Sequence, residues 1–309
     1  MKRFRGYFCV IGAACFWGAA ATLAKFLLNQ QMDPLLLVQA RVSFSCIVLC
    51  VVLAIASPGL LRIRLSDFWR FALLGILGLA GANITYYVTI RESSVATAIT
   101  IQYTAPLFVM AYEVFRSEEK FTGMKLIAAV LAVLGCLLVV TGFDFSGIQI
   151  SQLGLLTGIG SILTFSFLAI ATRHLLARYS MWTVTFYSIA CASMFWLLIN
   201  IPRTERMGEL SLNSWTALFL LAMVSVLIPN LLFAAGLRLV VPSRAVITST
   251  LEPVVAIVTA SVFIGETIGP AKAAGAGLVI VAIILLQLRR EEGEELSVVD
   301  RRDVVHDAQ

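Results

Sequence analysis

A carboxylate and a proline stand together inside an apolar stretch of the chain. Glu252 is the only charged residue from Ala245 to Gly265, and Pro253 follows it directly. An ionised carboxylate at the centre of a bilayer costs at least about 2.5 kcal/mol, so it is expected to face a cavity or a partner. Pro253 lacks a backbone N–H and leaves the carbonyl of Ser249 without its helical donor. A carboxylate beside a free carbonyl could bind an ammonium group or a proton.

Two roles for Glu252 follow from its setting. The residues at helical spacing from it are small or polar, among them Ser249, Ala256 and Thr259, which favours a face turned towards a cavity. Glu252 and Ser249 are therefore candidates for binding a substrate or a coupling proton. The alternative is a structural role, in which a protonated Glu252 bonds to a neighbouring helix and fixes the fold.

The first half of the chain has a similar proline in a neutral setting. Pro106 frees the carbonyl of Gln102, but Ala105 stands before it instead of a carboxylate. Gln102 and Tyr103 offer uncharged hydrogen bonds there, and we expect both to line the same cavity. For Gln102 the alternative is a hydrogen bond between helices, worth about 0.6 kcal/mol. Pro106 and Pro253 are predicted hinges.

Arg41 is a cation inside an apolar run. Its guanidinium could hold the carboxylate of a substrate through two parallel hydrogen bonds. It could also extend towards the membrane surface or pair with Asp33, two helical turns away. Tyr187, in the corresponding segment of the second half, is a further candidate for the same space.

Two asparagines and several aromatic residues complete the candidate binding set. Asn83 and Asn230 are amides in apolar runs, where an amide needs partners from packing or from a cavity. Tyr86 follows Asn83 by one turn, and Trp17 and Phe165 occupy matching positions in the two halves. Such rings could enclose an apolar or aromatic ligand, and the alternative is ordinary core packing.

The elements that carry these residues are predicted to be membrane-spanning helices. The chain is 60% hydrophobic and only 13% charged, whereas a soluble domain has about 25% charged residues. Its mean hydropathy is +0.93. Apolar runs near 20 residues recur, each long enough to cross a bilayer as a helix. We predict an all-α polytopic membrane protein. The ten predicted spans are 6–28, 35–57, 68–90, 94–115, 122–142, 152–174, 181–201, 214–237, 244–265 and 269–288.

Basic residues predict the orientation of these spans. With the N-terminus in the cytoplasm, 17 of the 23 Lys and Arg residues fall on the cytoplasmic side, five on the other side, and Arg41 within a span. The positive-inside rule therefore places both termini in the cytoplasm. The charged segment 289–309 is predicted to be a cytoplasmic tail.

The sequence repeats itself at an offset of 147 or 148 residues. Polar and helix-breaking residues match as well as apolar ones. The pairs include Gly6 with Gly154, Asn83 with Asn230, Arg91 with Arg238 and Pro106 with Pro253. Because each half contains five spans, an odd number, the second half must cross the membrane in the opposite sense to the first. This inverted repeat is a recurrent design of secondary transporters.

Three stretches resemble the EamA-type branch of the drug/metabolite transporter superfamily. They are "FWGAAATLAK", "QYTAPLFVMAYEVFRSEE" and "SRAVITSTLEPVVAIVTASVFIGETIGPAKAAGAGLVIV". The resemblance implies two EamA-like repeats, 1–148 and 149–288, and export or exchange of small metabolites. It departs in the first span, where Gly18 is followed by three alanines instead of the polar residue common in the family.

We therefore predict a secondary transporter in the cytoplasmic membrane. Its partners would be lipid and a small solute such as an amino acid, an amine or a drug-like molecule, with a proton as one candidate coupling ion. The alternatives are an intramembrane enzyme or a structural membrane protein. An enzyme would need a nucleophile and base or a metal set at membrane depth, and both histidines, 174 and 306, lie outside the apolar centres. We expect no cofactor, no metal and no nucleic acid.

Overall fold

The computed structural model describes residues 2–29, 32–117, 121–144, 150–200 and 211–288. These residues form helices and short connections, with no strand among them. The α-helices are α1 (Lys2–Asn29), α2 (Pro34–Ala56), α3 (Phe68–Leu73), α4 (Gly81–Glu92), α5 (Val95–Gln102), α6 (Ala105–Phe115), α7 (Gly123–Thr141), α8 (Gln152–Leu176), α9 (Met181–Asn200), α10 (Leu212–Ala222), α11 (Ile228–Leu237), α12 (Pro242–Ser249), α13 (Glu252–Ile264) and α14 (Pro270–Leu288). The 3₁₀ turns are η1 (Pro58–Leu61) and η2 (Leu65–Asp67), and the π-helical segments are η3 (Leu74–Ala80) and η5 (Met223–Leu227).

Short polar motifs set the helix starts. The Asp33 carboxylate accepts a hydrogen bond from the Leu35 N–H at 2.9 Å, and Pro34 opens α2 where no N–H is needed. Ser94 and Ser151 cap α5 and α8 in the same way, through their hydroxyl oxygens. These caps fix where each apolar segment begins.

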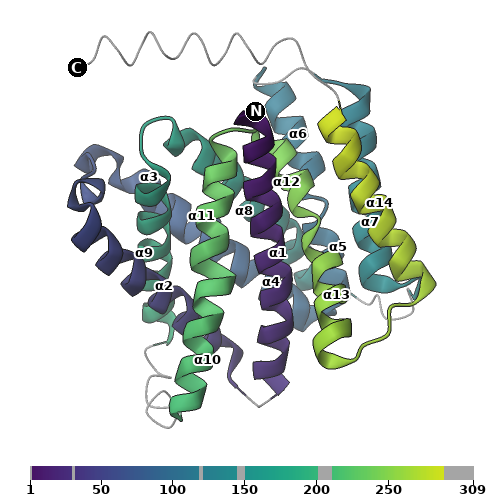
Figure 1. Cartoon of the computed structure of the whole chain (residues 1–309), viewed down its shortest axis with the longest axis horizontal. Helices are drawn as coiled ribbons and strands as arrows, with labels where there is room; N and C mark the ends of the chain where they lie inside the picture. The colour runs from purple at the N-terminus through teal and green to yellow at the C-terminus, as the bar shows by residue number, and fades with distance from the viewer. Residues whose placement is uncertain (1, 30–31, 118–120, 145–149, 201–210, 289–309) are drawn as a thin grey trace.

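The helices run back and forth in one bundle (Figure 1). In the described residues, nine segments are long and apolar enough to cross a membrane. The remaining predicted span, 94–115, consists of the two shorter helices α5 and α6. α1 begins and α14 ends on one side of the bundle, which we call the near side, and the opposite side is the far side. The predicted all-α fold is confirmed. The tail 289–309, and the boundary between the repeats at 148, lie outside the described residues.

Both halves break one helix at the same place in the repeat. α5 and α6 are separated at Tyr103 and Thr104, and α12 and α13 are separated at Thr250 and Leu251. The offset of 147 residues maps α5 onto α12 and the start of α6 onto the start of α13. The proline follows the break in each case, which agrees with its tolerance in the first turn of a helix.

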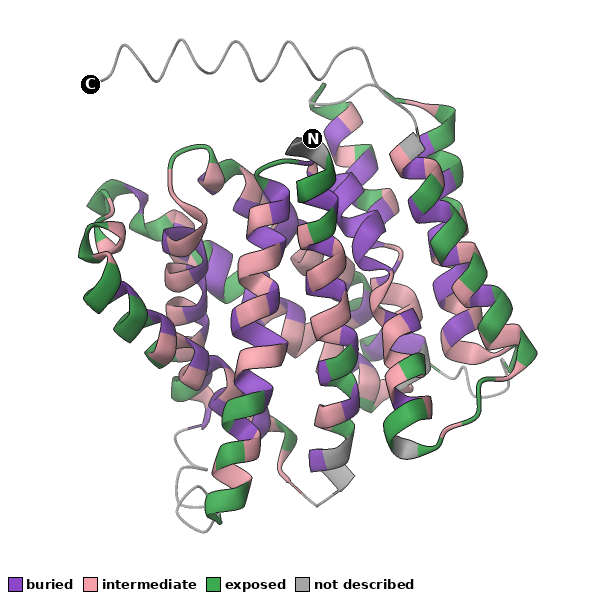
Figure 2. Cartoon of the chain, in the orientation of Figure 1, coloured by how far each residue is buried: buried purple, intermediate pink, exposed green. Residues whose placement is uncertain are grey.

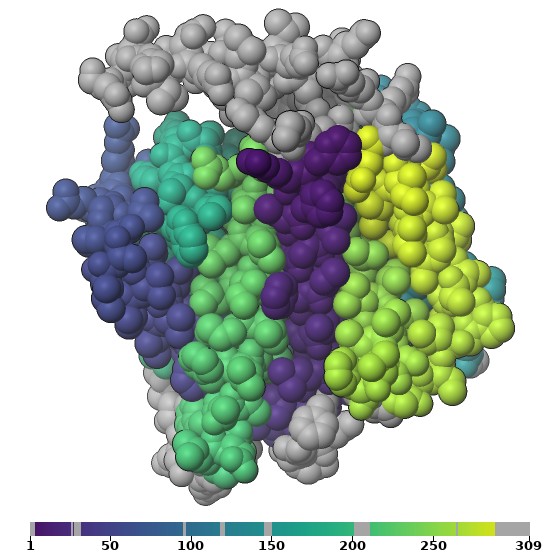
Figure 3. Space-filling view, viewed as in Figure 1, coloured from purple at the N-terminus to yellow at the C-terminus, as the bar shows by residue number. Residues whose placement is uncertain are grey.

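The first helix of each half packs against the other half. α1 contacts α11, α12 and α13, whereas α8 contacts η3, α4, α5 and α6. Figure 3 shows α1 between α11 and α13 on one face of the molecule. Each half of the chain therefore contributes its first helix to the packing of the other half.

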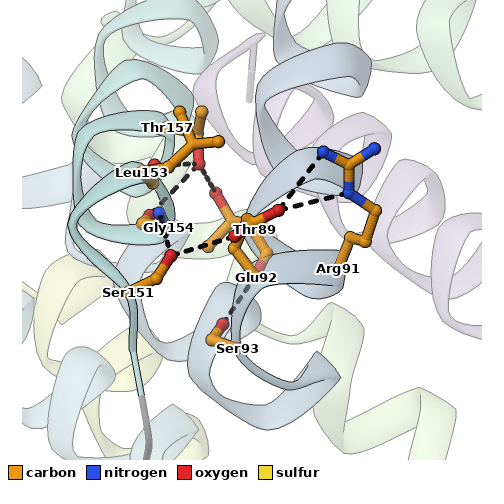
Figure 4. A network of polar contacts seen from close by, with 8 residues as sticks. All are labelled: Thr89, Arg91, Glu92, Ser93, Ser151, Leu153, Gly154 and Thr157. Atoms are coloured by element: carbon orange, nitrogen blue, oxygen red, sulfur yellow. Dashed lines mark hydrogen bonds and ion pairs between the residues drawn. The ribbon is translucent and has the colours of Figure 1, made fainter.

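A polar network joins α4 to α8 on the far side (Figure 4). The Ser151 hydroxyl donates to the Glu92 carboxylate at 3.1 Å and accepts from the Gly154 N–H at 3.0 Å. Thr89 donates to Thr157 at 2.9 Å one turn further into the bundle. This network caps α8 and holds it against the first half, and we assign it a structural role.

Candidate functional site

The two helix breaks lie near the middle of the bundle. Glu252 is the first residue of α13 and lies about halfway along the apolar segment Pro242–Phe263. A carboxylate in the first turn complements the positive end of the helix dipole. The Glu252 side chain is only partly buried.

Glu252 meets the break of the first half through Tyr103. The Tyr103 hydroxyl lies close enough to the Glu252 carboxyl group to interact with it, and the Tyr103 side chain is buried. Tyr86 of α4 and Cys136 of α7 lie close enough to interact electrostatically with the same carboxyl group. The structure thus brings three predicted site residues, Glu252, Tyr103 and Tyr86, together.

A close contact between α1 and α13 positions Glu252. A Cβ atom on Gly18 would lie 2.6 Å from the Glu252 carbonyl oxygen and 2.7 Å from Val255 Cβ. Only glycine allows the two helices to approach this closely. Four residues further along α1, the Thr22 and Thr259 hydroxyls are 2.8 Å apart. The first span, which lacks a polar residue after Gly18, thus makes a close backbone contact with α13 at this position.

Arg41 lies beside the predicted amide Asn83. Arg41 Nη2 donates to Asn83 Oδ1 at 2.5 Å, and Asn83 Nδ2 donates to the Leu79 carbonyl at 2.6 Å. Asp33, the partner considered from the sequence, caps the start of α2. Arg41 is partly exposed, and its buried Nε has no hydrogen-bond partner within the described residues. The guanidinium thus has a neutral partner and an unused donor.

The π-helical segments account for the matched asparagines. η3 and η5 each end three residues before an asparagine, and each asparagine amide donates to the carbonyl four residues earlier. π-Helical turns interrupt the regular hydrogen-bond ladder and are frequent at functional sites. Each asparagine therefore satisfies one backbone carbonyl of the π-helical segment, and the Asn83 Oδ1 in addition accepts from Arg41.

The second half has an uncharged version of the Arg41 site. At the offset of 147 residues, Ser188 replaces Arg41. Asn230 and Ser188 line a small recess between α8, α9 and α11, together with Thr172, Thr185 and Phe233. A polar recess thus stands where the first half places a guanidinium.

The aromatic residues meet across the repeat. The rings of Trp17 and Phe233 are 5.4 Å apart, and those of Tyr86 and Tyr87 are 5.9 Å apart. Trp17 and Phe165 pack against the same buried cluster of small and aliphatic residues. Trp17 and Phe233 thus form an aromatic contact between α1 and α11.

Two predicted site residues use their hydroxyl groups in bonds to backbone carbonyls. Ser249 is buried and donates to the Val246 carbonyl in its own helix at 2.8 Å. Tyr187 donates to the Leu61 carbonyl at 2.6 Å, at the connection that follows α2. Gln102 ends α5 next to Tyr103 and is partly exposed, as Glu252 is.

A buried ion pair towards the near side of the bundle was not predicted from the sequence. Lys125 Nζ lies 3.3 Å from Glu113 Oε2, with both side chains almost fully buried. The available signal was Glu113, the one carboxylate inside the predicted span 94–115. In the sequence, Lys125 contributes only to the cytoplasmic charges that set the orientation.

Comparison with known proteins gives a consistent family. The EamA-like transporter family matches the chain at residues 4–141 and 152–288. The chain is 23% identical over 290 residues to the uncharacterized inner membrane transporter YicL of Salmonella typhimurium, covering 92% of this chain and 95% of YicL. It is 26% identical over 238 residues to the threonine/homoserine exporter RhtA of Escherichia coli K12, covering 74% of this chain and 76% of RhtA.

The fold also matches a solved crystal structure. That structure superposes with a TM-score of 0.77 at 18% identity, covering 92% of this chain and 96% of the other. At this identity the likeness concerns the fold. Two family matches that together span most of the chain, and relatives named as transporters, lead to one conclusion. The chain is a multi-pass membrane protein and belongs to the EamA-like transporter family.

Proposed function

We propose that the protein is a secondary transporter that exports a small zwitterionic solute of the amino-acid class by alternating access. The observation that carries this proposal is the pair of opposite charges beside α4. Arg41 bonds to Asn83, and Tyr86, one turn further along the same helix, lies next to Glu252. One helical turn rises about 5.4 Å. A small solute between the two charges would meet a guanidinium with its carboxylate and Glu252 with its ammonium group.

The charges are costly unless they serve such a ligand. Ionisable groups within a membrane usually face a partner or a pathway. Arg41 has an amide partner and Glu252 a phenol, so each keeps capacity for an ion of opposite charge. RhtA, a relative of this chain, is named as an exporter of threonine and homoserine, which are zwitterions of this size. A proton on Glu252 that leaves when the ammonium group binds is our candidate for coupling.

The proposal also assigns the protein an orientation in the membrane and a conformational state. We place the near side in the cytoplasm because most basic residues lie there. α12 is buried along its whole length and packs against α6 (Figure 2), whereas the counterpart pair α5 and α13 barely touch. We therefore infer a state that is closed to the cytoplasm and more open to the outside. The pseudo-symmetric halves would exchange these roles during transport.

Counterflow into proteoliposomes tests the function. A panel of radiolabelled amino acids, amines and sugars is offered to vesicles preloaded with the same unlabelled solute. We expect accelerated uptake of one or a few amino acids, threonine and homoserine among the first tested. If no zwitterion is taken up faster than in protein-free vesicles, the proposed substrate class is wrong.

Charge-deleted analogues then test the two binding residues. For a transported amino acid, the amide analogue lacks the carboxylate charge and the N-acetyl analogue lacks the ammonium charge. We expect Arg41→Gln to weaken uptake of the amino acid about tenfold or more while leaving its amide analogue unaffected, because a hydrogen bond to a charged group is worth about 1.5–3 kcal/mol. Glu252→Gln should likewise weaken uptake of the amino acid about tenfold or more while leaving uptake of its N-acetyl analogue unaffected. Glu266→Gln, at the far surface, is the matched control. Unchanged uptake and selectivity in Glu252→Gln would make that residue structural.

A further inference from the structure

One carboxylate on the near side joins three helices. Glu113 of α6 accepts a hydrogen bond from the Ser243 N–H of α12 at 2.9 Å through Oε1. Its Oε2 lies 3.3 Å from Lys125 Nζ of α7. The exposed fraction of the side chain is 1% for Glu113 and 3% for Lys125. We call Glu113, Lys125 and Ser243 the near-side clamp.

The clamp is costly to break on one side because both of its charged side chains are buried. Removing one partner of a buried ion pair leaves an uncompensated charge and costs about 3–5 kcal/mol. The Ser243 N–H belongs to the first turn of α12, where the helix dipole also favours a carboxylate. Separating α12 from α6 would therefore remove the Ser243 N–H from the Glu113 carboxylate or expose that carboxylate to water.

The repeat cannot form the same clamp on the far side. The counterpart of Lys125 is Lys272, but the counterpart of Glu113 is Ala260, which has no carboxylate. The helix pairs differ accordingly, because α6 packs against α12 while α13 and α5 barely touch. An acid present in one half and missing from the other is the kind of difference that can favour one of two symmetric states.

We propose that the near-side clamp sets the resting state of the protein, by holding the near side closed in the absence of solute. This inference rests on the proposed alternating access and adds the element that biases it. Releasing the clamp should open α12 to water and, through the coupled halves, close the far side around α5. The clamp thus sets how often the site faces each side, independently of which solute is bound.

Hydrogen–deuterium exchange of the full chain in lipid nanodiscs tests the clamp without any solute. In the unmodified protein we expect α12 to exchange more slowly than its counterpart α5. The variant Glu113→Gln/Lys125→Met removes both charges and keeps the shapes of the side chains. We expect it to raise the exchange rate of α12 about tenfold and to slow α5, because a shift of state changes both layers in opposite directions. Glu113→Gln alone should act in the same direction.

Lys272→Met is the matched control, since it removes the counterpart of Lys125 where the repeat supplies no matching acid. It should leave α12 and α5 unchanged. Unchanged exchange in the double variant would overturn the proposal, and so would faster exchange in α12 and α5 together, which indicates general loosening. The proposed transport function is judged by counterflow, so its failure would leave the exchange result standing and be recognised separately.

Discussion

The near and far layers of the bundle are built from the same repeat but differ in charge. Near the near side, Glu113 ties α12 to α6 and α7 within a fully buried contact. On the far side, the equivalent position is Ala260, and Lys25 and Glu266 form an exposed ion pair. The backbone plan and several charges are thus repeated, whereas the carboxylates of Glu113 and Glu252 each occur in one half only. A repeat can supply two states of similar energy, and single side chains can then choose between them.

The largest expected effect comes from breaking the near-side pair on one side only. Lys125→Met should lower the free energy of unfolding by about 3–5 kcal/mol, because it removes one partner of a buried ion pair. Lys272→Met should leave stability nearly unchanged, because Lys272 is only half-buried and the acid near it, Glu266, is exposed. Thermal unfolding of the purified variants in the same detergent gives the comparison. Equal losses in both variants would remove the distinction between the two layers.

An intermediate effect is expected where α1 meets α13. Gly18→Ala should destabilise the protein by about 1–3 kcal/mol, because the added Cβ would overlap the Glu252 carbonyl and Val255. Gly277→Ala in α14 is the control, since a Cβ atom added there would meet nothing within 4 Å among the described residues. It should be neutral or slightly stabilising, as expected for alanine in a helix. A neutral Gly18→Ala would mean that α1 and α13 can separate without cost.

The smallest effect concerns the exposed pair on the far side. The hydrogen bond from Lys25 holds the pKa of Glu266 below its usual value. The contribution of this pair to stability is therefore present above the unfolded pKa of about 4.3 and is lost as the pH falls through the lowered folded pKa. Exposed pairs contribute about 0–1 kcal/mol. Glu266→Gln should therefore differ from the unmodified protein by only a small shift in Tm at pH 7, and the shift should disappear in acid. A shift that grows towards low pH would contradict this assignment.

The sequence predicted the helices and their breaks more fully than the contacts between them. The predicted span 181–201 is observed as α9 (Met181–Asn200), and the break before Pro253 separates α12 from α13. Apolar length, caps and prolines act within one segment, so they can be recognised along the chain. The position of Glu252 near the centre followed from the same evidence.

Partners across the bundle could not be predicted in this way. The repeat pairs Trp17 with Phe165, but the ring contact of Trp17 is with Phe233. Helical spacing suggested Asp33 as a partner for Arg41, whose guanidinium instead donates to Asn83. An inverted repeat relates residues at opposite depths, so a matched residue is a counterpart and seldom a neighbour. For the same reason the clamp on Glu113 was missed, since its partners lie on α7 and α12.

The exchanged packing of the first helices bears on how such a protein could arise and be dissected. α1 lies against α11, α12 and α13, while α8 lies against α4, α5 and α6 and is fastened there by Ser151 and Glu92. Each group of helices that would move during transport thus contains one helix encoded in the other half of the gene. A fragment carrying one repeat would lack the helix that covers its core, unless a second copy lent its own. An ancestral five-helix chain with this packing would have exchanged its first helix with a second copy. Fusion of the two copies would then have kept the exchanged arrangement within one chain.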